Sequence, residues 1–195
     1  MKYIALDKAF YAQDTIHLAK ALLGKILVHN SIEGITSGII VEVEAYKGKL
    51  DPASHTFRGE TKRNKIMFGE AGHAYIYFTY GMHYCFNVTA GPIGIGEGIL
   101  IRALEPIEGI DLMKNRRRKS NLKDLCNGPA KLVQAMGIMK NMYGEDLTKG
   151  SLIICKNNKS SNYIEIIETT RVGIKEGSDL LFRFYIKNNN FISKK

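Results

Sequence analysis

The stretch that decides the fold reads VEVEAYKGKLDPASHTFRGETKRN at residues 41–64 and MFGEAGHAYIYFTYGMHYCFNV at residues 67–88. Two alternating glutamates open it, and it also holds five tyrosines, three histidines and a basic turn. A hydrophobic core needs aromatic residues and a surface needs charges, but neither needs acids, cations and aromatic rings interleaved so densely. The mixture is typical of a pocket that holds a flat, neutral or cationic ring and carries out hydrolysis beside it.

The glutamates belong to a predicted strand over Ile35–Tyr46. Because successive side chains of a strand point to opposite faces, Ile40, Glu42, Glu44 and Tyr46 are expected on one face. One interpretation is the solvated face of an edge strand. The other is a carboxylate beside aromatic rings, which can activate water as a general base or stabilise the sugar cation that forms in glycoside cleavage.

Two strand-like runs, Ala74–Thr79 and His83–Thr89, surround a glycine-containing turn and predict a β-hairpin. Aromatic residues in strands most often pack against neighbouring strands. At the tip of the hairpin, where little core can reach, Tyr80 could instead wedge between base pairs. Tyr77 or Tyr46 could stack on an extruded base, and a cationic base would gain from cation–π attraction.

The other predicted elements are short and irregularly ordered. Strands do not alternate regularly with helices, so a doubly wound parallel sheet is disfavoured and a mixed, mainly antiparallel sheet with peripheral helices is expected. No linker or repeat divides the chain, which predicts a single domain over residues 1–195. The expected helices are Thr15–Leu23 after an Asp14 cap, one from Pro106 to about Asn115, and Ala130–Met136. The expected strands are Lys25–His29, Ile99–Leu104, Leu152–Cys155, Tyr163–Ile167, Arg171–Ile174 and Leu181–Ile186, with Arg116–Lys119 in a loop and Asn188–Lys195 as a frayed tail.

The bulk composition favours a polyanionic partner. The chain has 195 residues, a net charge of +9 and a pI near 9.4, which favours DNA or RNA ahead of a membrane surface. Cys85, Cys126 and Cys155 are far apart and odd in number, so neither a disulfide framework nor a zinc site is implied. No apolar run approaches the ~20 residues of a membrane span, and the start of the chain does not resemble a signal peptide. A cytoplasmic, nucleoid-associated protein is expected.

Several polar residues remain open to two interpretations. The basic turn that contains Arg58 and Arg63 is either a solvated face or a set of phosphate contacts. His55 lacks a second ligand at metal-binding spacing, so it either lines a pocket or supports the loop. Asn87 sits in an apolar strand, where it either ties the structure together or reads the edge of a base.

The motifs VEVEAYKGKLDPASH, RGETKRNKIMFGEAGHAYIYFTYGMHYCFNV, LIRALEP and CNGPAKL resemble the alkyladenine (3-methyladenine) DNA glycosylase family. The resemblance runs in order from about Leu6 to Tyr185 and fits a bacterial member. It implies a curved, mainly antiparallel sheet with a protruding hairpin. It further implies a monofunctional, monomeric DNA repair enzyme that uses no metal or organic cofactor. Such an enzyme flips an alkylated purine out of double-stranded DNA and hydrolyses its N-glycosidic bond.

The resemblance also implies roles for individual residues. Glu44 would position and deprotonate the attacking water, and Arg102 would lie near the attacked sugar and its phosphate. Tyr80 would fill the space left by the flipped nucleotide. The base pocket would be formed by Tyr46, His55, Tyr77 and Asn87, and the DNA backbone would be contacted by Arg58, Arg63, Met82 and Lys131.

Two rival functions and the choice of lesion stay open at this point. A non-catalytic nucleic-acid-binding module would use the same cations and aromatic rings for salt-sensitive stacking. A hydrolase of free nucleosides would use the same acid, but it leaves the basic excess and Tyr80 unexplained. The sequence does not rank 3-methyladenine, 7-methylguanine, hypoxanthine and ethenoadenine as lesions.

Overall fold

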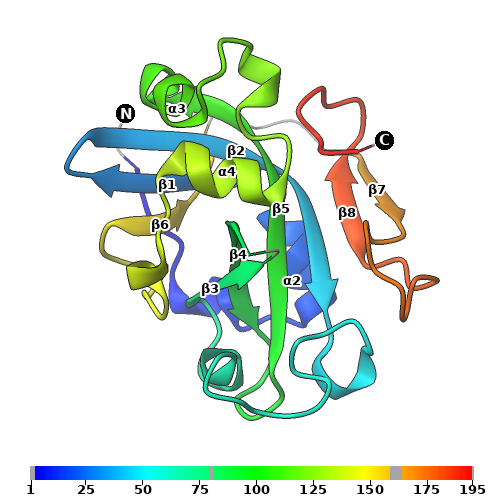
Figure 1. Cartoon of the computed structure of the whole chain (residues 1–195). Helices are drawn as coiled ribbons and strands as arrows, with labels where there is room; N and C mark the ends of the chain where they lie inside the picture. The colour runs from blue at the N-terminus through cyan, green and yellow to red at the C-terminus, as the bar shows by residue number, and fades with distance from the viewer. Residues whose placement is uncertain (1–2, 80, 159–163, 195) are drawn as a thin grey trace.

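The computed structural model describes residues 3–79, 81–158 and 164–194. Within these ranges the chain forms a curled antiparallel sheet in the order β3-β4-β5-β2-β1-β6, with β8 paired to β2 and β7 to β8 (Figure 1). The predicted mixed α/β fold with a mainly antiparallel sheet is therefore confirmed. The strands are β1 (Ile26–Ser31), β2 (Gly34–Tyr46), β3 (Ala74–Thr79), β4 (His83–Ala90), β5 (Glu97–Glu108), β6 (Leu152–Cys155), β7 (Ile166–Thr169) and β8 (Arg183–Ile186).

Strand β2 changes partner along its length, and this change shapes the site. Its first half pairs with β1 and its residues 42–44 pair with β8, while β5 runs along its other side. The ladder between β2 and β5 skips Val41 on one strand and Arg102 on the other. Such bulges bend a strand and re-aim its side chains. The simple alternation expected from the sequence is therefore wrong at this point, because Ile40 packs into the core with Val43 instead of sharing a face with the glutamates.

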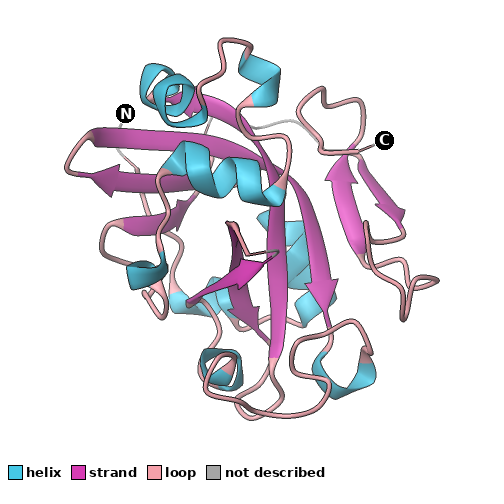
Figure 2. Ribbon diagram, in the orientation of Figure 1, coloured by secondary structure: helices cyan, strands magenta, loops and turns pink. Residues whose placement is uncertain are grey.

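Helices cover the sheet and begin at the residues that favour helix starts (Figure 2). The side chain of Asp14 accepts hydrogen bonds from the backbone of Ile16 at 2.9 Å and His17 at 3.4 Å, which confirms the predicted cap. Pro129 occupies the first turn of the predicted helix after Gly128. The α-helices are α1 (Lys8–Tyr11), α2 (Thr15–Leu22), α3 (Ile110–Arg117) and α4 (Pro129–Met136), and the 3-10 turns are η1 (Gly48–Leu50), η2 (Lys65–Phe68), η3 (Leu122–Asp124) and η4 (Lys140–Met142).

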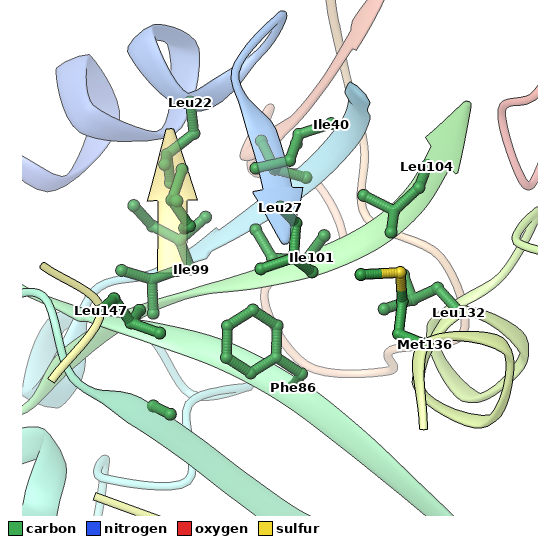
Figure 3. Packing of buried hydrophobic residues seen from close by; sticks show 14 of the residues in the cluster. Leu22, Leu27, Ile40, Phe86, Ile99, Ile101, Leu104, Leu132, Met136 and Leu147 are labelled. Atoms are coloured by element: carbon green, nitrogen blue, oxygen red, sulfur yellow. The ribbon is translucent and has the colours of Figure 1, made fainter. Parts of the chain in front are cut away.

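One hydrophobic cluster holds these elements together (Figure 3). Leu22 of α2 and Leu132 of α4 belong to the same cluster as Phe86, Ile101 and Leu104 of the sheet. Each fully buried side chain of this kind contributes about 1.5–3 kcal/mol relative to exposure. The core thus fixes β2, β4 and β5 relative to one another. The side chains of these strands that do not enter the core are therefore held in fixed positions, where they can form a site.

The helix predicted from Pro106 to about Asn115 is present, but its predicted start is wrong. Pro106 lies inside β5 opposite Gly38, and α3 begins only at Ile110, after Gly109 with φ of 72°. Beyond Leu100, β5 no longer pairs with β4, so a proline there need not remove a ladder hydrogen bond. Arg116 lies in α3 instead of in the predicted loop.

The C-terminal region also differs from expectation. Residues 171–174 form a loop and not the predicted strand. β7 spans Ile166–Thr169, later than predicted, and Tyr163 lies outside the described residues. The tail is not frayed at Asn189, whose amide donates to Glu105 Oε2 at 2.9 Å. No helix in the described ranges has the length and apolar character needed to cross a bilayer.

Candidate active site

A cavity of about 240 Å³ opens beside β2. It gathers five residues predicted for the site from five segments of the chain. Its walls include Tyr46 of β2, His55 of the loop after η1, Tyr77 of β3, Asn87 of β4 and Arg102 of β5, together with Tyr75, Val172 and Pro129.

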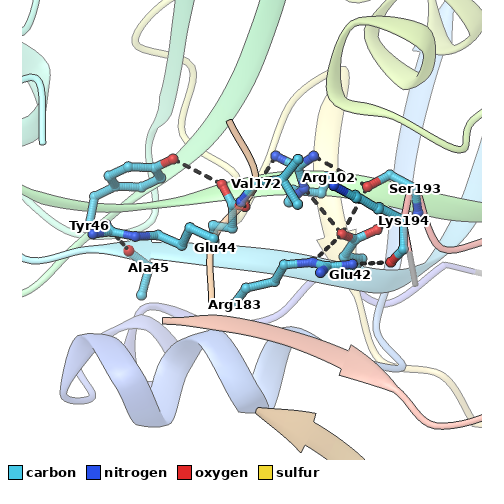
Figure 4. A network of polar contacts seen from close by, with 10 residues as sticks. Glu42, Glu44, Ala45, Tyr46, Arg102, Val172, Arg183, Ser193 and Lys194 are labelled. Atoms are coloured by element: carbon cyan, nitrogen blue, oxygen red, sulfur yellow. Dashed lines mark hydrogen bonds and ion pairs between the residues drawn. The ribbon is translucent and has the colours of Figure 1, made fainter. Parts of the chain in front are cut away.

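Glu44 is fully buried directly behind this wall. Its Oε2 accepts a hydrogen bond from the Tyr46 hydroxyl at 2.9 Å, and its Oε1 accepts one from the backbone N–H of Val172 at 2.7 Å (Figure 4). Arg102 Nη1 lies 3.2 Å from Oε1. All three partners line the cavity. The solvated edge strand is therefore the wrong interpretation, and the carboxylate is oriented by groups that face the cavity.

Tyr46 stays protonated in this setting. Burial and the adjacent Glu44 carboxylate raise the pKa of Tyr46, so its hydroxyl remains the donor. The Arg171 guanidinium lies 4.7 Å from the centre of the Tyr46 ring. Arg171 is itself anchored by Asp51 Oδ1 at 2.8 Å and by the carbonyl of Ala45 at 3.0 Å. The ring is thus fixed by a buried ion pair that supplies little net charge.

Neutral aromatic rings form another wall of the cavity. His55 Nδ1 lies 3.0 Å from the Tyr75 hydroxyl, and the His55 and Tyr77 ring centres are 4.5 Å apart at 78°. His55 is partly exposed, but desolvation of its ring by the surrounding protein and the nearby charge of Arg63 lower the pKa of His55 to about 4. Burial raises the pKa of Tyr75 to about 12. At neutral pH these rings are uncharged, so they can stack on a planar ring and attract a cationic one.

Asn87 lies in β4 between Tyr75 of β3 and Leu100 of β5. It is buried, and its Nδ2 donates to the Tyr75 carbonyl at 3.2 Å. The residue therefore ties the hairpin together and also lines the cavity, so the two interpretations from the sequence are not exclusive.

Glu42 forms a second buried acid centre next to the first. Its Oε1 accepts from Arg102 Nε at 3.1 Å, from Arg183 Nε at 2.7 Å and from the Ser193 hydroxyl at 2.9 Å (Figure 4). Arg102 thus bridges the two glutamates. A buried charge is tolerated when it is paired and hydrogen-bonded, as both acids are here.

The residues predicted to contact DNA lie outside the cavity. Arg58 and Met82 are exposed, and Lys131 is half-buried with its Nζ donating to Asn127 Oδ1 at 2.7 Å. Arg63 is exposed, lies 5.2 Å from the centre of the Tyr77 ring and donates to the Phe78 carbonyl at 3.3 Å.

The intercalation prediction falls on Tyr80, which lies outside the described residues. The next residue, Gly81, has φ of 68°, and the N–H of Met82 donates to the Thr79 carbonyl. The predicted hairpin turn, with a glycine free to adopt positive φ, is confirmed.

Sequence reasoning missed the distant groups that hold the two glutamates and Tyr46. Val172 and Arg171 lie in one predicted strand, Arg183 in another and Ser193 in the tail expected to be frayed, and none of the four was given a role in the site. Their contacts span from 91 to 151 residues along the chain, a separation that leaves no local signal. Within the described ranges, no three His, Cys, Asp or Glu side chains are placed to hold a metal ion.

Comparisons with known proteins agree with this geometry. Residues 9–190 match the family model described as methylpurine-DNA glycosylase. A protein of Carboxydothermus hydrogenoformans is 50% identical over 97% of this chain and 99% of its own length, and one of Methanoculleus marisnigri is 48% identical over 98% and 100%. One of Francisella tularensis is 51% identical over 93% and 94%. All three carry the name "Putative 3-methyladenine DNA glycosylase". The chain therefore belongs to the methylpurine-DNA glycosylase family.

Proposed function

We propose that this protein removes alkylated purines of the 3-methyladenine class from double-stranded DNA by hydrolysing the N-glycosidic bond, leaving an abasic site. The observation that carries the proposal is the buried Glu44 carboxylate, held by three donors that also line a cavity walled by neutral aromatic rings. Family membership supports the same reaction.

The acid is arranged to act on water. A carboxylate offers about four acceptor positions. Tyr46, Val172 and Arg102 occupy three of them, which leaves about one for a water molecule. As the water oxygen bonds to the anomeric carbon, its proton passes to Glu44. The glycosidic bond breaks, and its electron pair leaves with the purine.

The cavity walls account for a preference for alkylated bases. Alkylation at N3 or N7 gives the purine a positive charge, which the faces of Tyr46 and Tyr77 attract. His55, neutral at pH 7, adds no opposing charge. The electron pair of the broken bond neutralises the departing base, so departure needs little acid assistance. Asn87 lies where it can contact the edge of a bound purine.

DNA reaches the cavity as an extruded nucleotide in this proposal. Damaged, weakly stacked bases cost less to flip out of a duplex than normal bases. Tyr80 fills the space that the nucleotide leaves, and Arg58, Arg63, Met82 and Lys131 contact the backbone. The net charge of +9 draws a monomer of the protein to the duplex.

The direct test is incubation of the protein with methylated duplex DNA, followed by alkali and separation of the strands. Strand breaks at methylated purines, absent when Glu44→Gln replaces the wild type, are expected. Salt-sensitive binding without breaks would instead support the non-catalytic binding module. Release of base from a free nucleoside at the same rate would support a nucleoside hydrolase. Duplexes with single 3-methyladenine, 7-methylguanine, hypoxanthine or ethenoadenine lesions then establish the substrate range.

A further inference from the structure

The three nitrogens of the Arg102 guanidinium have three different partners. Nε donates to Glu42 Oε1 at 3.1 Å, Nη1 lies 3.2 Å from Glu44 Oε1, and Nη2 donates to the Ser193 hydroxyl at 3.3 Å. A guanidinium is planar, with donors in a fixed fork. Three partners around one plane fix both the position and the tilt of the guanidinium. Nη1, which faces Glu44, is therefore oriented by the hydrogen bonds of Nε and Nη2.

Ser193 acts on both ends of this arrangement. Its hydroxyl donates to Glu42 Oε1 at 2.9 Å and accepts from Arg102, while its backbone N–H donates to Glu42 Oε2. A single residue therefore contacts both Arg102, which touches Glu44, and Glu42, which shares Arg102 with Glu44.

The segment that carries Ser193 is held in place by hydrogen bonds at both of its ends. We define residues 189–194 as the closing segment. Asn189 Nδ2 donates to Glu105 Oε2 at 2.9 Å, and the N–H of Phe191 donates to Asn189 Oδ1 at 2.8 Å. At the other end, the Lys194 carbonyl accepts from Arg183 Nη2. Since the family match ends at residue 190, Ser193 lies beyond the matched region.

We propose that Ser193, together with Glu42, is a positioning residue that sets the orientation of Arg102 and thereby of Glu44 during base excision. The inference rests on the proposed function and adds a part of the chain that the matched motifs do not include. Neither residue lines the cavity, and the role proposed for each acts through Arg102, so both are positioning residues.

Charge balance explains why a second acid is needed. Glu42 and Glu44 face Arg102 and Arg183 in a buried cluster of two acids and two arginines. With Glu42 in place, the charge of Arg102 is shared between two carboxylates. Without it, Arg102 is free to turn fully onto Glu44 and to occupy the acceptor position that the water needs. Displacements of about 1 Å at a reacting group can cost 10²-fold in rate.

The test compares four full-length proteins: the wild type, Ser193→Ala, Ser193→Thr and Lys194→Ala. Ser193→Ala removes the hydroxyl but keeps the backbone N–H to Glu42. Ser193→Thr keeps a hydroxyl. Lys194→Ala is the matched control, because the structure uses the Lys194 carbonyl and leaves its side chain exposed. For each protein the measurements are the single-turnover excision rate at saturating enzyme, the Kd for a lesion-containing duplex and the melting temperature.

For Ser193→Ala we expect an excision rate about tenfold below wild type, in line with loss of one hydrogen bond to a charged group. The Kd should stay close to wild type and the melting temperature should fall by only a few degrees, while Ser193→Thr should restore most of the rate. Lys194→Ala should match the wild type. A purely structural role would move the melting temperature or Kd and spare the rate constant of bound substrate, which would overturn the inference.

Glu42→Gln is a second variant with a larger expected effect, of about 10²-fold on the same rate constant. It is also expected to lower the melting temperature, because Arg102 and Arg183 lose a charged partner. The Ser193 variants therefore decide whether the inference holds. An active wild type with an equally active Ser193→Ala overturns the inference and leaves the proposed function standing. A wild type inactive on every lesion overturns the proposed function itself.

Discussion

The backbone N–H of Val172 donates to Oε1 of Glu44 at 2.7 Å and joins the central strand β2 to a loop 128 residues further along the chain. The same Val172 lines the cavity. The loop therefore fixes one oxygen of the acid, and it does so at the cavity wall.

Glu44→Gln is expected to retain binding to alkylated duplex DNA and to lose base release by at least about 10²-fold, the lower end for removal of a general base. Glutamine keeps the size of the side chain but cannot accept the proton of water. Binding is measured by fluorescence anisotropy, and release by alkali cleavage in a single turnover. Excision by the variant at a wild-type rate would remove Glu44 from the mechanism.

Val172→Pro deletes the donor to Glu44 and is expected to lower the excision rate by about 10- to 150-fold, the equivalent of one hydrogen bond to a charged group. Val172→Ala keeps the N–H and should lose much less. The single-turnover rates of both variants are compared after circular dichroism has shown that each is folded. Equal losses in the two variants would mean that the side chain, and not the N–H, is what matters.

Local signals in the sequence predicted much of the fold. The Asp14 cap, the proline that opens α4 and the hairpin glycine Gly81 all lie where the structure uses them. Pro106 misled the prediction because it is a helix-starting residue that β5 accommodates where β4 no longer pairs. The bulge at Val41 could not be predicted, since the register of β2 depends on β5, β1 and β8 together.

The candidate site, like the fold, could be predicted from the sequence only in part. Glu44, Tyr46 and Tyr77 could be selected because they lie in one dense stretch of sequence. Asp51 lies in the same stretch, but nothing local marks it as the partner of Arg171, and Arg171 gave no signal at all. Their ion pair forms across 120 residues, and only the packed fold brings the two together.

Asp51→Asn tests that ion pair. Both side chains are fully buried, so the variant leaves Arg171 as a buried cation with a neutral partner. Loss of a buried partner typically costs about 3–5 kcal/mol, and we expect the free energy of unfolding in urea to fall by roughly that amount. Asp111→Asn is the control, because the Asp111 side chain is 94% exposed. A change as small in Asp51→Asn as in the control would show that the pair contributes little to stability.

Tyr80→Ser is expected to weaken binding to lesion duplexes and to slow flipping, because serine cannot fill the space that an extruded nucleotide leaves. A fluorescent base analogue beside the lesion reports the rate of flipping in stopped-flow experiments. Met82→Ser is a matched control two residues away, an exposed side chain for which only backbone contact is proposed. Unchanged flipping in Tyr80→Ser would refute the wedge role.

The pKa of His55 lies near 4 in the folded protein, below the ordinary value of 6.5, first through desolvation of its ring and then through the charge of Arg63. The unfolded chain therefore takes up this proton at a higher pH than the folded protein does. The stability that neutral His55 contributes is fully present above about pH 6.5 and is lost as the pH falls toward 4. Arg63→Ala removes the smaller of the two causes, so the pKa of His55 should rise but stay below 6.5. NMR titration of the imidazole resonances of both proteins measures the two values directly. A wild-type pKa near 6.5 would mean that His55 is readily charged, and a cationic purine would then meet repulsion in place of a neutral ring.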